Sequence, residues 1–271
     1  MVTAVLFHSS ADGFLPTELA GSPWQPGVLH GGAPAGLLAY CLERHISNPD
    51  LQPARLSIDL LRPVPRSPLK VTVRPLREGK RIVLLEASVF AGDNLVALAT
   101  GLFVKAQPVT LPEHAPRYRA KLDGPDGIET VSFREVLFGN SDSMPPGLHT
   151  TVQLRPVSRL QESGRGSAWI SLPVPIIEGQ PNSPFMLAAL VSDFGNGVGQ
   201  LSLGNNVGTI NADVMLQLSR LPEGEWIGLE SEALLDESGV GQVVTVLHDH
   251  IGRIGQVSQS IMPMASFVGT N

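Results

Sequence analysis

The stretch TINADVMLQL, residues 209–218, alternates polar and apolar side chains along its length. Successive side chains of a β-strand point to opposite faces, so this alternation is typical of a strand with one buried face. The spacing predicts that Thr209, Asn211 and Asp213 share one face of that strand. A hydroxyl, an amide and a carboxylate would then stand in one row.

A similar stretch occurs in the first half of the chain. SIDLLRPVP (57–65) aligns with INADVMLQLSRLP (210–222), and GDNLVALATGLF (92–103) aligns with IGRIGQVSQSIM (251–262). The first alignment places Asp59 against Asp213. The repeat has a period of about 150 residues, so it indicates the duplication of a whole domain and not a solenoid.

The order strand, strand, helix and four strands is predicted twice. The helices are expected at 30–46 and 183–194, and Leu37, Leu38, Cys41 and Leu42 give the first helix one buried stripe. Strands are expected at 3–9, 13–19, 54–61, 69–76, 81–90, 95–104, 150–156, 167–174, 208–218, 226–235, 241–248 and 253–264. One helix followed by consecutive strands with short connections predicts an α+β fold with antiparallel sheets. We therefore expect domains at 1–105 and 149–271, joined by a surface linker at 106–148.

The composition excludes several classes of function. Asp and Glu outnumber Lys and Arg by 25 to 19, which is against a general nucleic-acid-binding surface. Cys41 is the single cysteine, so no disulfide framework or cysteine metal site is expected. No signal peptide is recognised, and no apolar stretch approaches the roughly 20 residues of a membrane span. The expected location is cytoplasmic.

Two further side chains can join Thr209. Asp193 stands near the end of an apolar helical run, SPFMLAALVSDFG, and Gln259 lies in a late strand, RIGQVSQSIM. A carboxylate, a hydroxyl and an amide from three elements could converge on a water molecule, which favours hydrolysis. A plainer interpretation stays open, in which Asp193 is a solvated residue before a helix cap and Thr209 an ordinary strand residue.

A helix wrapped by an antiparallel sheet, repeated in one chain, with HGG (30–32) opening the first helix, resembles the hotdog fold. The segments LVSDFGN (190–196), GTINADVML (208–216) and GRIGQVSQSIM (252–262) resemble those of the type II acyl-CoA thioesterases. The resemblance implies a double hotdog, with two tandem helix-wrapped sheets pairing within one chain. It also implies an acyl-CoA substrate, no cofactor or metal, and a possible homodimer or higher homo-oligomer.

In that family the aspartate, the hydroxyl and the glutamine orient the attacking water, which implies Asp193, Thr209 and Gln259 as catalytic residues. Asp193 could act as a base if burial raises its pKa, or it could attack the thioester directly. The family carries Asp-His after Thr-Ile, whereas Asn211-Ala212 stand here.

Substrate contacts are expected mainly in the first half. Backbone N–H groups at Gly31 and Gly32 could stabilise the oxyanion, and His30 could contact substrate. Arg62 and Arg81, from a basic strip, would meet the CoA phosphates. The acyl chain is expected along the apolar helix–sheet interface.

Three alternatives remain. A non-catalytic acyl-CoA or lipid-binding protein would keep the pocket and lose the chemistry. A hotdog hydratase or dehydratase usually works with an Asp–His pair, for which the sequence offers no candidate in the right place. A metal site at His248, Asp249 and His250 lacks a further ligand at a recognised spacing.

Overall fold

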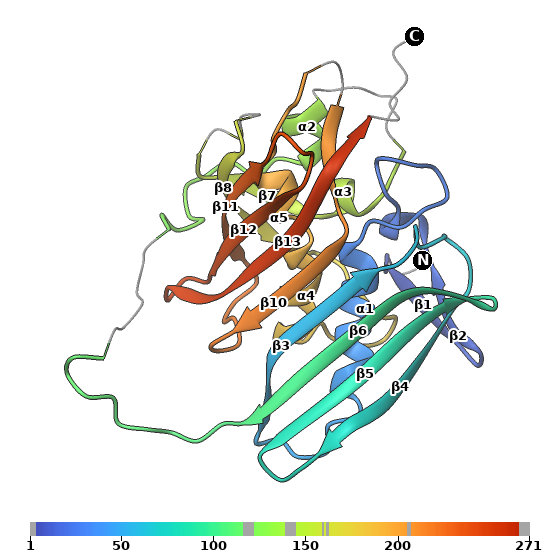
Figure 1. The fold of residues 1–271 in the computed structure, drawn as a ribbon, viewed down its shortest axis with the longest axis vertical. Helices are drawn as coiled ribbons and strands as arrows, with labels where there is room; N and C mark the ends of the chain where they lie inside the picture. Colours follow the sequence, from blue (N-terminus) through green and yellow to red (C-terminus); the bar gives the residue numbers. More distant parts are fainter. Residues whose placement is uncertain are drawn as a thin grey trace.

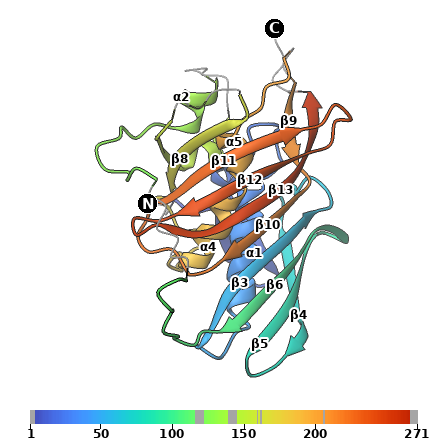
Figure 2. The same cartoon turned by 60° about the vertical axis from the view of Figure 1, so that its left-hand side comes forward.

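The structure is a computed structural model that describes residues 4–115, 122–138, 145–158, 160, 163–204 and 207–265. The described strands form one long antiparallel sheet, and the two main helices lie behind it in the view of Figure 1. Figure 2 shows the same sheet from one side, with these helices against its concave face. No helix of the described residues is long and apolar enough to cross a membrane.

The first half contains one buried helix and six strands. Its elements are β1 (Phe7–Ser10), β2 (Gly13–Pro16), the 3-10 turn η1 (Glu18–Ala20), α1 (Gly32–Glu43), β3 (Leu51–Leu60), β4 (Leu69–Glu78), β5 (Ile82–Ala91) and β6 (Asn94–Lys105). Pro34 lies in the first turn of α1, where its missing N–H costs no hydrogen bond.

Helix α1 is buried on all sides, so the prediction of a single buried stripe is wrong. From Gly32 to Leu42 every residue except Tyr40 is buried. The reason is that α1 packs against β4, β5 and β6 on one side and against helix α4 (Pro184–Ser192) of the second half on the other. A helix enclosed in this way needs no polar face.

The second half repeats the first with added short helices. Its elements are α2 (Phe133–Phe138), α3 (Leu148–Thr151), β7 (Gln153–Pro156), β8 (Arg165–Ser171), α4, α5 (Gly195–Val198), β9 (Val207–Asn211), β10 (Asp213–Leu218), β11 (Ile227–Leu235), β12 (Gly241–His248) and β13 (Arg253–Ala265). Part of the segment expected as a linker packs onto this half. Val131 and Leu154 exchange two backbone hydrogen bonds, and Phe133 is buried.

The strand order confirms the predicted repeat. The sheet runs β1-β2-β4-β5-β6-β3 and then β10-β13-β12-β11-β8-β7, so the second half traces the order of the first in reverse. The halves join where β3 pairs antiparallel with β10. The predicted α+β arrangement of two tandem halves with antiparallel strands is therefore present.

The core helices α1 and α4 run antiparallel. A Cβ at Gly32, the first residue of α1, would lie 2.6 Å from the carbonyl oxygen of Leu190 in the last turn of α4. At the opposite ends, the Ser183 hydroxyl donates to Glu43 Oε2 at 2.5 Å. Ser183 is also the N-cap of α4, because its Oγ accepts the Met186 N–H at 3.1 Å. The start of α1 and the end of α4 therefore meet.

A bulge divides the stretch predicted as one strand at 208–218. Asn211 pairs with Ile261 but Met215 pairs with Ser258, so β9 and β10 together carry one more residue than the facing part of β13. The extra residue changes which side chains face inwards. Thr209 and Asn211 point to the helix side, and Asp213 points to the outer face, where it accepts the Ser260 N–H. The prediction that all three share one face is wrong for Asp213.

Candidate active site

A pocket of about 360 Å³ opens where the start of α1 meets the ends of α4 and α5. Both halves contribute to its wall. The lining residues are Ser22, Pro23, Trp24, Gln25, Val28, Leu29, His30, Gly31, Leu60, Pro63, Phe133, His149, Asp193, Phe194, Asn196, Gly197, Thr209, Ile210, Asn211 and Met264. The wall is mostly apolar, with a few polar groups from separate elements, as is common for small-molecule sites.

The central feature of this pocket is a pair formed by His30 and Asp193. His30 Nδ1 lies 2.8 Å from Asp193 Oδ2, and both side chains are largely buried. His30 comes from the loop before α1 and Asp193 caps the end of α4, so the antiparallel packing of the helices brings them together. The expectation that the chain lacks an Asp–His pair in the right place is wrong. Residues 163 positions apart in sequence gave no local signal of this contact.

The carboxylate fixes the tautomer of His30. Gly32 N–H lies 3.2 Å from His30 Nδ1 and also reaches the Asp193 carboxylate. An ionised carboxylate can only accept, so Nδ1 must carry the proton that it shares with Asp193. The Gly32 N–H then donates its hydrogen bond to the Asp193 carboxylate. In neutral His30 the remaining nitrogen, Nε2, keeps a lone pair that can accept a proton.

Asp193 is held in its charged form. Burial alone would raise its pKa, but hydrogen bonds and charge from His30, the Asn211 amide and the Gly32 N–H outweigh burial and leave the pKa below its ordinary value. Asn211 Nδ2 donates to Oδ1 at 3.1 Å. A pKa raised by burial, the condition under which Asp193 could act as a base, is therefore not met.

The two glycines predicted for oxyanion contact pack closely against the end of α4. A Cβ at Gly31 would lie 2.8 Å from each carboxylate oxygen of Asp193. A Cβ at Gly32 would approach the Leu190 carbonyl oxygen. The HGG segment thus allows the His30 loop to approach Asp193, and Gly31 also lines the pocket.

Thr209 lines the same pocket and is paired with an asparagine that the sequence did not single out. The Thr209 hydroxyl donates to Asn196 Oδ1 at 2.9 Å, and Asn196 Nδ2 donates back to the Thr209 carbonyl at 3.0 Å. Asn196 lies three residues after Asp193, in the segment FGNG. Asn211, which the sequence placed on the same strand face as Thr209 without a catalytic role, contacts Asp193 directly.

Gln259 lies outside the pocket wall. It is 1% exposed, on the inner face of β13, and a Cβ at Gly195 would lie 2.7 Å from its Oε1. Neither amide atom has a hydrogen-bond partner within the described part of the chain. Gln259 therefore packs beneath the turn that follows Asp193.

The two arginines expected at the CoA phosphates are far apart. Arg62 lies between Leu60 and Pro63, which line the pocket, and its Nη1 donates to Asn94 at 3.3 Å. The carbonyl of Arg81 accepts the Lys105 N–H, and Lys105 pairs with Leu51 at the other end of β3. Ten strand residues separate these ends by about 30 Å. Arg62 thus follows a lining residue in sequence without lining the pocket itself, and Arg81 is distant from the pocket.

Aromatic rings and a second histidine complete the wall. The ring of His30 stacks on Phe194 with centroids 4.5 Å apart, and Phe133 contacts Phe194 at 5.1 Å. His149, from α3, is buried and lines the pocket. Sequence reasoning missed His149 and Phe133 because both lie in or beside the segment expected as a linker.

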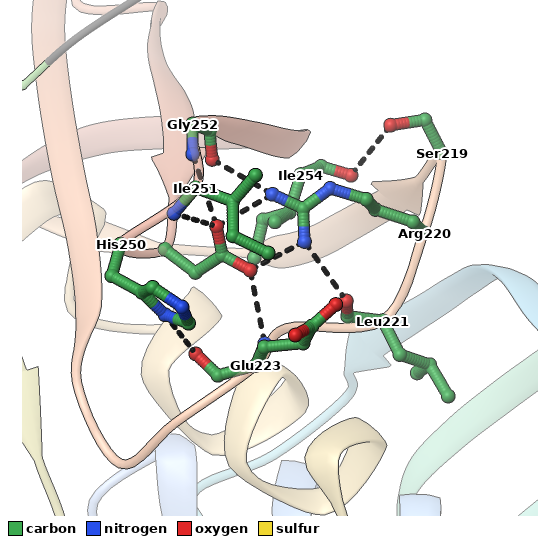
Figure 3. Close-up of polar contacts among 9 residues, drawn as sticks. Ser219, Arg220, Leu221, Glu223, His250, Ile251, Gly252 and Ile254 are labelled. Carbon is green, nitrogen blue, oxygen red and sulfur yellow. Dashed lines mark hydrogen bonds and ion pairs between the residues drawn. The ribbon is translucent and has the colours of Figure 1, made fainter. Parts of the chain in front are cut away.

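Away from the pocket, a cluster of polar contacts around Asp249 connects two loops (Figure 3). Arg220 forms a two-pronged ion pair with the Asp249 carboxylate. The N–H groups of Glu223, Ile251 and Gly252 donate to the same carboxylate. Burial opposes the charged form, but these donors lower the pKa of Asp249 to about 2. All its acceptor positions are used to tie the β12–β13 turn to the β10–β11 connection.

The histidines beside Asp249 have other partners. His248 Nε2 lies 2.7 Å from Glu230 Oε2, and His250 Nδ1 lies 3.1 Å from the Glu223 carbonyl. Within the described ranges no three His, Cys, Asp or Glu side chains gather in a way that could hold a metal ion.

Two family models match most of the chain. The model described as the acyl-CoA thioesterase N-terminal domain matches residues 20–104, and the model of the acyl-CoA thioesterase C-terminal domain matches residues 125–262. No curated protein sequence matches the chain.

Solved structures share the fold at low sequence identity. A hot dog fold protein of unknown function from Alicyclobacillus acidocaldarius is 14% identical, with a TM-score of 0.72 over 96% of each chain. Acyl-CoA thioesterase II TesB2 from Mycobacterium marinum is 15% identical, with a TM-score of 0.66 over 87% of this chain and 89% of that one. The tesB protein of Mycobacterium avium subsp. paratuberculosis is 14% identical, with a TM-score of 0.63 over 93% and 92%. Identities this low show the fold alone.

Proposed function

Because the chain belongs to the acyl-CoA thioesterase family, we propose that it hydrolyses an acyl-CoA thioester to a carboxylic acid and CoA. The observation that carries this proposal is the buried His30–Asp193 pair at the wall of an apolar pocket. We further infer that the halves form a double hotdog, with domains at 1–105 and 149–271. The continuous sheet through β3 and β10 supports this arrangement. A homodimer or higher homo-oligomer remains a prediction.

In the proposed mechanism His30 is the base and Asp193 its positioning residue. A water molecule attacks the thioester carbonyl carbon, and His30 Nε2 takes the proton that the water loses. The tetrahedral intermediate then collapses, the carbon–sulfur bond breaks, and the CoA thiolate takes the proton from His30. Asp193 stays ionised throughout and stabilises the imidazolium, because its pKa is lowered.

Thr209 and Asn211 hold the geometry around this pair. Asn211 fixes one carboxylate oxygen of Asp193 while His30 uses the other. Thr209 faces the same pocket, and its hydroxyl oxygen can still accept a hydrogen bond from the attacking water. Gln259 supports the turn after Asp193 from below, and for direct contact with the water its side chain would have to move.

Substrate binding is divided between the pocket and its rim. The acyl group would occupy the apolar pocket, where the lining residues that the structure describes include no Lys or Arg. Arg62, two residues after Leu60 of the pocket wall, would meet a CoA phosphate. Arg81 would require the CoA moiety to extend along the whole length of β3.

The first experiment measures CoA release from acyl-CoAs for the wild type, Asp193→Asn and the matched control Asp213→Asn. Asp213 begins β10, directly after the strand that carries Thr209, but its side chain lies on the outer face of the sheet, away from the pocket. Replacing the orienting carboxylate of a His pair costs about 10³–10⁴-fold in turnover in comparable sites. Turnover that collapses only in Asp193→Asn, with unchanged thermal melts, supports the proposal. Full turnover in that variant would support hydrolysis but refute the role of Asp193, and the site would then lie elsewhere.

The His30–Asp193 pair also favours a second candidate, hydration or dehydration of an acyl thioester. There a histidine removes a proton next to the carbonyl and no thiol is released. Loss of enoyl absorbance without free CoA would identify this reaction. Absence of both reactions, with acyl-CoA still raising the melting temperature, would identify the non-catalytic binding protein.

A further inference from the structure

We propose that the pocket selects a compact acyl group, up to about eight carbons in a straight chain, and that Leu60 limits its length. The proposal rests on the proposed thioesterase function and adds the substrate class. The region between α1 and the sheet, next to the pocket, is packed with side chains.

The interface between α1 and its neighbours is closely packed at two described glycines. A Cβ at Gly36 would lie 2.9 Å from Ile176 Cδ1, and a Cβ at Gly101 of β6 would lie 3.0 Å from Leu42 Cδ1. These contacts show that helix, sheet and the segment before α4 already touch at these glycines. Close-packed interiors of this kind do not open for a ligand without loss of packing energy. At these two positions the expected course of the acyl chain along the helix–sheet interface is filled by side chains.

The acyl group must then fit in the pocket itself. Below His30 and Gly31 no residue of α1 lines it, and no residue of β4, β5, β6, β11 or β12 does. At the ~30 Å³ that a water-sized group occupies in a liquid, about 360 Å³ holds roughly a dozen non-hydrogen atoms. The thioester and the adjoining carbons of CoA take about four of these, which leaves about eight for the acyl chain.

Leu60 forms part of the pocket wall, and its backbone is held by a hydrogen bond. It is the last residue of β3, on the inner face with Leu56 and Ile58, and it lines the pocket. Its N–H donates to the Ala212 carbonyl at 3.1 Å, so its backbone is fixed against the bulge between β9 and β10. A larger side chain at this position must enter the pocket.

The next residue provides a matched control. Leu61 is 49% exposed and does not line the pocket. Its N–H donates to the Val96 carbonyl at 3.1 Å, so its backbone is equally well held. The same substitution at positions 60 and 61 therefore differs only in whether the side chain reaches the pocket.

The test is kcat/KM for acetyl-, butanoyl-, octanoyl- and palmitoyl-CoA with the wild type, Leu60→Trp, Leu60→Ala and Leu61→Trp. We expect the wild type to prefer acyl groups of up to eight carbons and to use palmitoyl-CoA at least ~10-fold less well. Leu60→Trp should lower the octanoyl-to-butanoyl ratio by ~10-fold or more, because about one chain segment is excluded. Leu60→Ala should move the preference to longer chains, and Leu61→Trp should keep the wild-type profile.

Two results would overturn the proposal. One is palmitoyl-CoA used as well as octanoyl-CoA by the wild type. The other is the same chain-length profile for the variants at positions 60 and 61. Calorimetric binding of the same four CoA esters tests the pocket independently of turnover, and it must show the same length limit. Absence of all hydrolysis would count against the proposed function, whereas absence of a length limit in binding would count against this inference.

Discussion

Asp59 of β3 and Asp213 of β10 stand directly opposite each other in the strand pair that joins the two halves. Asp213 accepts the Ser260 N–H, so its carboxylate has a structural partner in β13. Like charges directly opposite each other in a strand pair destabilise the pairing. The junction between the halves therefore places two like charges opposite each other.

Replacing Asp59 should stabilise the protein. We expect Asp59→Asn to raise the free energy of unfolding by about 0.2–1 kcal/mol in urea denaturation at low salt. The gain should shrink in high salt, where the repulsion is already screened. Asp93→Asn, an exposed change in the β5–β6 turn, is the control and should give no comparable gain. A loss of stability in Asp59→Asn would show that its carboxylate is needed.

A methyl group at Gly31 should disable the site without unfolding the protein. Its Cβ would meet both carboxylate oxygens of Asp193 at 2.8 Å, and Asp193 can yield only by breaking its contacts with His30 and Asn211. Displacements of this size in a catalytic group cost about 10²-fold in rate. Gly208→Ala is the control, because a Cβ there meets nothing within 4 Å. Equal kcat/KM for the two variants would contradict the proposed role of the pair.

The Asp249 cluster makes stability depend on pH. The pKa of Asp249 is about 2 in the folded protein and 3.8 ordinarily, so its contribution is present above pH 3.8 and lost as pH falls towards 2. We expect Asp249→Asn to destabilise the protein by roughly 2–3 kcal/mol at neutral pH. The difference from the wild type should narrow below pH 3.8.

Denaturation of both proteins across this pH range checks this expectation. Asp12→Asn, an exposed change in the turn between β1 and β2, should follow the wild type throughout. A difference that stays constant down to the lowest pH would mean that the charge of Asp249 is not what stabilises the cluster.

The repeat was visible in the sequence because each half needs the same alternation of inward and outward side chains. The matched segments around Asp59 and Asp213 therefore predicted the repeated order of strands and main helix along the chain, which the structure shows. The bulge after Asn211 was not predictable, since Ala212 is an ordinary strand residue and the extra residue is defined only by the partner strand.

The site was predicted in its parts but not in its pairing. Asp193, Thr209 and His30 were each picked out by residue type and position. The contact of His30 with Asp193 depends on the antiparallel packing of α1 and α4, which local patterns do not encode. The direction of the pKa shift of Asp193 was not predictable for the same reason. Its burial was foreseeable, but the hydrogen bonds from His30, Asn211 and Gly32 were not.

Ser183 should matter for stability and not for chemistry. Ser183→Ala removes both the cap of α4 and the hydrogen bond to Glu43, whose pKa is raised mainly by burial. We expect a loss of about 1–2 kcal/mol in chemical denaturation, with kcat/KM unchanged below the melting temperature. Ser47→Ala, at an exposed position after α1, serves as control. A large loss of activity in folded Ser183→Ala would show that the two ends of the helix pair are coupled.

The Ser183–Glu43 contact stands where the repeat would place a second copy of the His30–Asp193 pair. In an assembly of two identical subunits, both ends of the helix pair would carry the same residues, and any mutation would alter both together. Fusion into one chain removes that constraint. One end carries the ionisable His30–Asp193 pair beside a pocket, while the other carries a hydrogen bond between Ser183 and Glu43 that connects α4 with α1. The two ends of the helix pair can therefore differ within one chain, and a mutation at one of them leaves the other unchanged.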